Sequence, residues 1–498
     1  MPAGLAGKLS SKEEFSSALR TITEVDPRIP LVVDLDGTFL LTDTLVESFV
    51  SLLFRSPLAA AFSLLFLVKG RAAFKRHLAR RSPPHTQDLP RRLELIELLQ
   101  REKERGREIH LVTAADQKVA DLAAGAVGLF DSAAGSDGRS NLKGARKLDY
   151  LRGRFRNGFI YAGDAASDLP IFLASRAAIL CDVSHATAAA VARAGTVILV
   201  QLRRNGNPLA QWVSALRVAQ WSKNLFIFVP LVTGHAYGDP SNVAMAAAGL
   251  VVLCALTSGT YIVNDLCDLA ADRSHPAKRA RPFASGGLPV AFGLIAAPLM
   301  IAGAVAAGFA LSVPFAETLL AYFLLSTLYS LRLKQFPLLD VLVIAVLLSL
   351  RIVMGAELIQ LAHSPWLLSF SLAFFVSLAS AKRHVEVMSV ARAGSSSVGG
   401  RGYRGEDWPL TLTFGVGAGL VSIVVMLLYM TNDAASSGLY GRPGWLYAIP
   451  ILLWAWLMRI WLMSHRLELN HDPVTFALTD LPSLGAGAAV VLAFLLSL

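Results

Sequence analysis

Residues 244–272 read AMAAAGLVVLCALTSGTYIVNDLCDLAAD, an uncharged run that ends in three closely spaced aspartates. A run of about 20 apolar residues is long enough to cross a bilayer as one helix. Asp265, Asp268 and Asp272 follow one another at i, i+3 and i+7, a spacing that places them on one face of a helix. Carboxylates crowded at the end of a span repel one another unless divalent cations lie between them, and Mg²⁺ prefers oxygen ligands. The stretch therefore predicts a membrane protein with a magnesium site that binds a diphosphate.

Long apolar runs continue on both sides of this stretch. The chain of 498 residues is 54% hydrophobic and only 16% charged, a balance that excludes an ordinary soluble enzyme. We predict an all-α polytopic bundle with about nine membrane spans of about 20 residues each. The predicted spans lie near residues 225–238, 244–263, 289–311, 315–331, 338–358, 366–385, 410–430, 446–463 and 481–498.

Positive charge is distributed unevenly between the predicted loops. If residues 264–287 face the cytosol, alternate loops place nearly all Arg and Lys of this half inside, and the opposite loops hold essentially only Arg442. The positive-inside rule describes this asymmetry for multi-pass proteins of the cell (inner) membrane. We interpret the net charge of +10 as attraction to anionic lipid rather than to nucleic acid.

The N-terminal part differs in composition from the rest, because it has frequent charged side chains and no apolar leader segment. We predict a cytosolic domain over residues 1–206 and a membrane domain over residues 207–498. The alternation of helical patterns with β-like runs predicts an α/β Rossmann-like fold with a parallel sheet, and a helical cap at about residues 40–108. The β-like runs end at Leu35, Thr113, Asp164 and Asp182.

Reactive side chains stand at the ends of these runs, where ligands bind in parallel sheets. Asp34 and Asp36 lie two positions apart, and Gly37 permits the chain to turn so that both reach one site. One carboxylate can attack phosphorus while the other transfers protons, and a cation relieves the crowding of charge. The other candidates are Thr113 and Lys143 for phosphate oxygens, and Asp164 and Asp168 for Mg²⁺.

These elements resemble the haloacid dehalogenase (HAD) superfamily, whose motifs match Asp34–Thr38, Thr113, Lys143 and Asp164–Asp168 over roughly residues 30–200. The resemblance implies a phosphatase in which Asp34 forms an aspartyl phosphate and Asp36 is the general acid and base. It also implies a phosphate held by Thr113 and Lys143, a Mg²⁺ held by Asp34, Asp36 and Asp164, and support from Asp168. For each motif alone, a turn or a solvated charge is an equally good interpretation, but four motifs in order favour the phosphatase.

The aspartate stretch resembles the first aspartate-rich motif of the UbiA superfamily of intramembrane prenyltransferases, matched at Asn264, Asp265, Asp268 and Asp272. The resemblance covers about residues 207–498 and implies that these aspartates are catalytic and bind Mg²⁺. Further motifs are most similar to the branch that transfers phosphoribose from phosphoribosyl diphosphate to a polyprenyl phosphate. Together with charge, they indicate substrate-binding roles for Lys223, Asn224, Asn264, Lys278, Arg279, Arg281, Tyr329, Lys334, Lys382 and Arg383.

The second half of the bundle departs from conventional aromatic prenyltransferases, which carry a second aspartate-rich motif. Only Asp340 stands at that position, so a second magnesium cluster is doubtful. Lys334, Asp340 and Arg351 are candidates to contact a sugar phosphate or a lipid monophosphate instead. Cationic side chains at span ends more often determine topology than bind ligands. Arg351, however, lies well inside a predicted span, where a charge is costly unless it faces a cavity.

The two resemblances together predict a bifunctional enzyme. The membrane domain is expected to make 5-phosphoribosyl-polyprenyl phosphate, and the HAD-like domain to remove its 5′-phosphate on the way to an arabinosyl donor for cell-wall arabinan, with Mg²⁺ in both domains. Two alternatives stay open. One is a UbiA-type aromatic prenyltransferase that uses a polyprenyl diphosphate beside an independent phosphatase, and the other is a noncatalytic membrane scaffold or lipid-binding protein.

Overall fold

The computed structural model of the chain describes residues 22, 25–204, 206–394, 401–434, 440–469 and 472–498. The chain forms two compact units. We call residues 1–215 with 262–296 the α/β unit, and residues 216–261 with 297–498 the helical unit. This division assigns the aspartate-rich stretch to the same unit as the N-terminal part, whereas the sequence predicts a single boundary near residue 207.

A parallel sheet of six strands forms the centre of the α/β unit, in the order β3-β2-β1-β4-β5-β6. Leu31 of β1 pairs with Ile109 of β2 on one side and with Ile160 of β4 on the other. The predicted α/β fold with a parallel sheet is therefore confirmed. The strands are β1 (Leu31–Val33), β2 (Ile109–Asp116), β3 (Ser132–Ser136), β4 (Ile160–Gly163), β5 (Ala177–Cys181) and β6 (Val197–Leu202).

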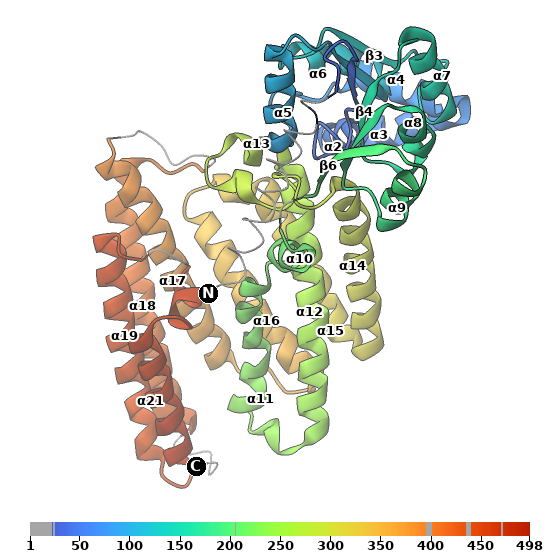
Figure 1. Cartoon of the computed structure of the whole chain (residues 1–498). Coiled ribbons are helices and arrows are strands. Elements are labelled where there is room, and N and C mark those ends of the chain that lie inside the picture. The colour runs from blue at the N-terminus through green and yellow to red at the C-terminus, as the bar shows by residue number, and fades with distance from the viewer. Residues whose placement is uncertain (1–21, 23–24, 205, 395–400, 435–439, 470–471) are drawn as a thin grey trace. The chain divides into compact units, whose positions relative to one another are not determined.

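Helices cover both faces of this sheet (Figure 1). Leu31 and Val33 pack with α5 (Leu93–Glu104) and α6 (Gln117–Gly125), whereas Val32 between them packs with the opposite helices. Successive side chains of a strand point to opposite faces, so a strand buried on both faces reads as an unbroken apolar run. The opposite helices are α7 (Ala145–Arg154), α8 (Leu169–Ala174) and α9 (His185–Arg193).

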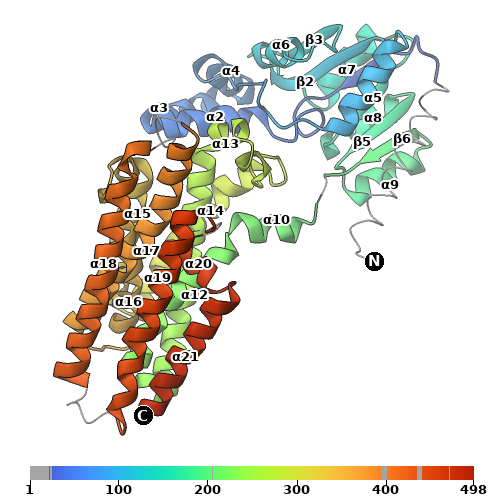
Figure 2. The same cartoon turned by 90° about the vertical axis from the view of Figure 1, so that its left-hand side faces the viewer.

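A group of helices follows β1 and precedes α5, at the position predicted for the cap. It consists of α2 (Thr44–Arg55), α3 (Pro57–Leu64), the 3-10 helix η1 (Leu65–Lys69) and α4 (Arg71–Arg81). Asp43 caps α2 by accepting hydrogen bonds from the backbone N–H groups of Leu45 and Val46. Figure 2 shows these helices grouped together beside the sheet to which they are joined in the chain.

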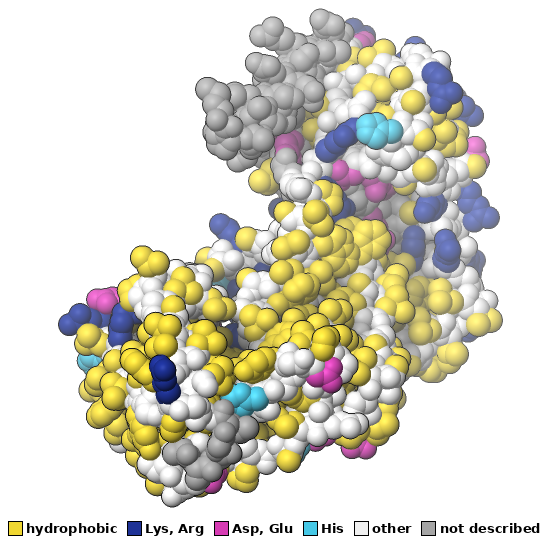
Figure 3. Space-filling view, turned by 90° about the horizontal axis from the view of Figure 1, so that it is seen from below, with side chains coloured by type: hydrophobic (Ala, Val, Ile, Leu, Met, Phe, Trp, Pro, Cys, Tyr) yellow, Lys and Arg dark blue, Asp and Glu magenta, His cyan; other side chains and the backbone are white. Residues whose placement is uncertain are grey.

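Seven helices of the described residues are long and apolar enough to cross a membrane. They are α12 (Pro240–Cys267), α14 (Val290–Leu311), α15 (Val313–Leu331), α16 (Leu339–Leu358), α17 (Pro365–Arg392), the segment Gly405–Ala434 with α18 (Trp408–Tyr429), and the segment Pro443–Arg466 with α19 (Ala448–Arg466). The chain is a multi-pass membrane protein. Hydrophobic side chains accordingly cover a large share of the face seen in Figure 3.

Two of the nine predicted spans differ from the expectation. Residues 225–238 are no continuous α-helix, because they divide between the 3-10 helix η3 (Val218–Phe228), the five-residue α11 (Val229–Thr233) and a further 3-10 turn. The last predicted span is α21 (Leu481–Ser497), an apolar helix of 17 residues. At 1.5 Å per residue it is about 25 Å long, somewhat shorter than a typical hydrocarbon core.

Candidate functional site

Carboxylates gather at the carboxyl edge of the sheet, where β1 and β4 end. Asp34 follows β1, Asp164 follows β4, and Asp168 ends the 3-10 helix η2 (Ala166–Asp168). One oxygen of each of these three side chains lies within 4.8 Å of the others, a spacing at which one cation can be shared. Gly37, at φ +75°, lies against Asp164, and any Cβ at this position would collide with the Asp164 carboxylate.

Asp36, predicted as a metal ligand, is directed elsewhere. Its carboxylate accepts a hydrogen bond of 2.9 Å from the backbone N–H of Thr44 at the start of α2. In the described part of the chain, the close carboxylate group contains Asp168 instead of Asp36. Burial and the charge of Asp43 raise the pKa of Asp36 well above its ordinary value. A raised pKa favours the protonated form of Asp36, which can donate a proton. This is the general-acid role that the resemblance implies for Asp36.

A lysine that the sequence analysis did not single out contacts this group. Lys147 on α7 is buried, with Nζ 3.0 Å from Asp34 Oδ1. It donates a 2.7 Å hydrogen bond to Tyr161, whose hydroxyl donates to Asp168. Lys143, the predicted phosphate contact, lies four residues earlier, in the loop before α7, and is exposed.

Burial and the closeness of the carboxylates disfavour their ionised forms. Burial and the charges of Asp34 and Asp168 raise the pKa of Asp164 from its ordinary value of 3.8 to about 7. Burial also raises the pKa of Asp168. The positive charge of a divalent cation would relieve the repulsion between these carboxylates. Mg²⁺ suits the position because it prefers oxygen ligands. The residues at this edge therefore fit a magnesium ion held by Asp34, Asp164 and Asp168.

The cap reaches the same edge. Lys75 of α4 donates hydrogen bonds to the backbone oxygen of Ala114 at 2.6 Å and to Asn141 Oδ1 at 3.1 Å. A small pocket of about 40 Å³ lies beside it, lined by Asp36, Asp43, Thr44, Leu45, Ser48, Lys75, Leu78, Ala79, Ala115, Asp116 and Val119. Thr113, the predicted phosphate contact, is buried nearby on β2, where its hydroxyl accepts from the N–H of Ala115.

The aspartate-rich stretch lies where α12 ends. Asp265 is in the last turn of α12, Asp268 joins it to α13 (Leu269–Ser274), and Asp272 lies within α13. Backbone N–H groups of Asp268 and Asp272 bond to the oxygens four residues earlier, so the helical path continues across the junction. Asp265 and Asp272 are buried, and Asp268 is half-buried.

Arg281 bridges two of these aspartates. One guanidinium nitrogen lies 3.2 Å from Asp265 Oδ1 and 2.6 Å from Asp272 Oδ2. The other oxygen of Asp272 is buried and accepts no hydrogen bond from the described residues. A buried carboxylate oxygen without a donor is costly, and a cation beside it would remove that cost. The donor set therefore fits Mg²⁺, while Lys278 and Arg279 remain exposed on the following turn.

In the helical unit, Asp340 at the start of α16 is fully buried among cations. Arg383 of α17 lies with Nε 2.9 Å from its carboxylate, and Arg401 lies 3.4 Å away. The hydroxyl of Tyr403 donates a 2.7 Å hydrogen bond to the second oxygen, and Arg401 also donates to Tyr329. Three predicted binding residues, Tyr329, Asp340 and Arg383, thus belong to one network.

Arg351 belongs to a separate network on α16. It donates to Asn224 Oδ1 and to the hydroxyl of Tyr322, each at 3.0 Å, and to the backbone oxygen of Leu347. Eleven residues of helix separate it from Asp340, which corresponds to about 16 Å along the axis. The two predicted phosphate contacts are therefore not brought together, and Lys334 lies half-buried in the 3-10 helix η6 (Leu333–Gln335).

Two further predicted cations meet at an acid that the sequence analysis missed. Asp472 lies 3.0 Å from Nζ of Lys223 and 3.5 Å from Nζ of Lys382. Asp472 also caps α20 (Pro473–Ala477) by accepting from the N–H of Val474. No motif around Asp472 indicates this role, because Lys223 and Lys382 are both distant from it in the sequence.

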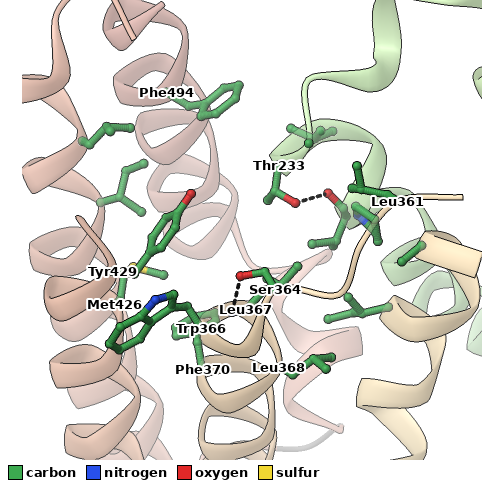
Figure 4. A pocket seen from close by; sticks show the side chains of 18 of the residues that line it. Thr233, Leu361, Ser364, Trp366, Leu367, Leu368, Phe370, Met426, Tyr429 and Phe494 are labelled. Atoms are coloured by element: carbon green, nitrogen blue, oxygen red, sulfur yellow. Dashed lines mark hydrogen bonds between the residues drawn. The ribbon is translucent and has the colours of Figure 1, made fainter. Parts of the chain in front are cut away.

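An apolar cavity of about 890 Å³ lies in the helical unit. Figure 4 shows Trp366 of α17, Tyr429 of α18 and Phe494 of α21 projecting toward it. The hydroxyl of Thr233 donates a hydrogen bond to the backbone oxygen of Val229 and therefore adds little polarity to the cavity lining. Such a lining suits a hydrocarbon chain better than a charged group.

The chain matches a protein-family model and is similar to individual known proteins. The protein-family model that matches the chain is that of the UbiA prenyltransferase family, over residues 225–477. An uncharacterized protein of Sinorhizobium fredii, y4nM, is 43% identical over 95% of this chain and 92% of its own length.

More distant similarities extend over parts of the chain. The decaprenyl-phosphate phosphoribosyltransferase of Corynebacterium glutamicum is 32% identical over 37% of this chain and 56% of its own length. A UbiA homolog from Archaeoglobus fulgidus, solved bound to DMAPP and Mg²⁺, is similar with a TM-score of 0.44 and 16% identity over 58% of this chain and 97% of that chain.

Proposed function

Because this chain belongs to the UbiA prenyltransferase family, we propose that its membrane part transfers 5-phosphoribose from phosphoribosyl diphosphate to the phosphate of a polyprenyl lipid. The observation that carries the proposal is the unsatisfied, buried oxygen of Asp272 beside Asp265. The local similarity to a phosphoribosyltransferase supports the choice of donor. The phosphates of that donor are anionic and could accept hydrogen bonds from Lys278 and Arg279, the exposed cations that follow the aspartates.

The transfer forms a bond between a lipid phosphate oxygen and C1 of the ribose, and it breaks the bond between C1 and the diphosphate. Asp265, Asp268 and Asp272 would hold Mg²⁺, which neutralises the leaving diphosphate when bound. Arg281 already balances part of the aspartate charge, and Lys278 and Arg279 on the adjacent turn would contact phosphate oxygens.

The α/β unit is proposed to remove the 5′-phosphate from the product. Asp34 would attack the phosphorus, and Asp36 would donate a proton to the departing ribose oxygen and later accept one from water. The raised pKa of Asp36 supports the first of these steps. Lys147 pairs with Asp34 at 3.0 Å, and its charge would also attract phosphate oxygens bound beside Asp34.

The test supplies the purified full chain with phosphoribosyl diphosphate, Mg²⁺ and a polyprenyl phosphate, and follows lipid products by mass. The unaltered protein should yield the ribosyl lipid without its 5′-phosphate. Asp34→Asn should accumulate the phosphorylated lipid, because transfer continues and hydrolysis stops. Asp268→Ala should abolish both lipid products.

Asp239→Asn is the matched control, since Asp239 is an exposed carboxylate before α12 that accepts a hydrogen bond from the backbone N–H of Ser241. It should leave the product pattern unchanged. Failure to use this donor, combined with turnover of an aromatic acceptor and a polyprenyl diphosphate, would replace the phosphoribosyl assignment by aromatic prenylation.

A further inference from the structure

The cap carries an exposed apolar segment that the proposed chemistry does not use. Residues 57–69, which comprise α3 and η1, form an apolar helical segment too short to cross a bilayer. Leu58 is 86% exposed, Leu65 60% and Val68 90%. A contiguous apolar patch of this kind on a water-facing domain indicates an interaction surface.

The neighbouring helix carries only positive charge. Residues 55–81 contain seven Lys and Arg and no Asp or Glu. Lys69, Arg71, Arg80 and Arg81 are exposed, and a hollow of about 450 Å³ beside them is lined by Phe66, Lys69, Ala73, Arg76, His77, Arg80, Arg81 and Gly138. We call residues 57–81 the cap face.

Internal contacts hold the apolar and basic parts in one orientation. The ring of His77 on α4 stacks on Phe66 of η1 at 4.0 Å, and Lys69 lies over the same ring. Ala60 and Leu78 are buried where α3 and α4 pack together. The two helices bury these sides and leave Leu58 of α3, Leu65 of η1 and Arg71, Arg80 and Arg81 of α4 exposed.

We propose that the cap face docks on a bilayer surface that contains anionic lipid. The apolar side chains of residues 57–68 enter the boundary between headgroups and acyl chains, and the exposed Arg71, Arg80 and Arg81 of α4 contact lipid phosphates. Interfacial helices bind by this combination of apolar area and basic charge. The spans of the same chain keep a bilayer within reach, so docking requires no encounter from solution.

Docking has a consequence for the phosphatase pocket. Lys75 points from α4 into the pocket beside Asp36, so a docked cap face fixes that pocket close to the membrane surface. A phosphate attached to a lipid would then reach this pocket while the lipid chain stays in the bilayer. This consequence rests on the proposed function, whereas docking itself does not.

The experiment places an environment-sensitive fluorescent amino acid at Val68 in the full chain. The protein is reconstituted in vesicles of equal parts phosphatidylcholine and phosphatidylglycerol that carry spin-labelled lipid as a quencher. Strong quenching and a blue-shifted emission are expected at Val68. The same probe at Leu93, an apolar residue 74% exposed on α5, is the control and should remain unquenched.

Charge is tested with two triple variants. Each arginine near an anionic surface raises the equilibrium constant for docking roughly fivefold. The triple variant Arg71→Gln, Arg80→Gln and Arg81→Gln should therefore lower the ratio of docked to undocked protein about 100-fold. Arg152→Gln, Arg156→Gln and Arg193→Gln remove three exposed arginines elsewhere on the unit and should have no effect. Vesicles of phosphatidylcholine alone should reduce quenching as the first variant does.

Three results would overturn the proposal. One is equal quenching at Val68 and Leu93. Another is quenching that changes neither when the anionic lipid is removed nor when Arg71, Arg80 and Arg81 are substituted. A blue shift at Val68 without quenching by the lipid label would show that protein, rather than lipid, covers the cap face. Hydrolysis is not measured, so failure of the proposed phosphatase leaves these results interpretable.

Discussion

Asp164 should make magnesium binding depend on pH. Its pKa is raised to about 7 by burial and by two neighbouring carboxylates, so much of it is protonated just below neutrality. A protonated carboxyl is a poor metal ligand, and its ionised fraction falls roughly tenfold between pH 8 and pH 6. We expect Mg²⁺ to bind the α/β site about tenfold more weakly at pH 6. Calorimetric titration of the Asp268→Ala protein, in which the membrane site is disabled, measures this affinity.

The same raised pKa sets the pH dependence of stability without Mg²⁺. Between about pH 4 and pH 7 the native state binds more protons than the unfolded state, so stability falls as pH rises through this window. With a chelator present, the melting temperature should decrease from pH 5 to pH 8, and Asp164→Asn should flatten the curve. A melting temperature that rises over this range would contradict the assignment of Asp164.

Lys147 shows how far single residues could be predicted. The aspartates at the strand ends were identified from sequence because parallel strands end at one edge, and the structure brings Asp34, Asp164 and Asp168 together. The lysine that reaches Asp34 depends on how α7 rotates against the sheet, which no short motif encodes. Asp472 was missed for a related reason, because its partners Lys223 and Lys382 are distant in sequence.

At the scale of elements, the Asp340 network should hold α16, α17 and the segment at residues 401–403 together. Asp340→Ala removes the partner of Arg383, whose side chain is 1% exposed. We expect a loss of about 3 kcal/mol in unfolding free energy, at the lower end for a broken buried pair because Glu386 still pairs with Arg383. Thermal unfolding of the protein in detergent measures the change.

Glu317→Ala on α15 is the matched control for this loss. Glu317 is an exposed acid within a predicted span, so its removal should change stability by less than about 0.5 kcal/mol. Equal melting temperatures for the Asp340 and Glu317 variants would show that the network contributes nothing. Transfer activity lost without any change in melting temperature would instead favour the predicted substrate contact at Asp340.

Long apolar helices were easier to predict than the short helical segments between them. Hydropathy located the seven long helices because crossing a bilayer requires a long apolar run. The same measure misread residues 225–238, since it counts apolar side chains and is blind to the hydrogen-bond pattern that makes η3 a 3-10 helix. Pro230 in α11, which donates no backbone hydrogen bond, was the available warning.

At the scale of the whole molecule, composition alone separated a charged part from an apolar part. It gave no sign that residues 262–296 would pack with the N-terminal unit. That packing includes the buried pair of Arg273 with Glu47 on α2, at 2.6 Å. A loop between two spans shows no local preference for a partner more than two hundred residues away.

The two proposed reactions should be separable by mutation, and the overall conversion should be restored when the two variants are combined. Asp34→Asn retains transfer, and Asp268→Ala retains hydrolysis, so each supplies the step that the other lacks. The intermediate is expected to stay in its own bilayer, because each buried CH₂ of a lipid anchor contributes about 0.8 kcal/mol to membrane binding. Reconstituting both variants in the same vesicles should therefore yield the dephosphorylated ribosyl lipid, detected by mass. Mixing vesicles that each hold one variant should leave the phosphorylated lipid unprocessed. If the shared vesicles also fail while each variant keeps its own step, the intermediate passes only between the two sites of one polypeptide, and free diffusion in the bilayer is excluded.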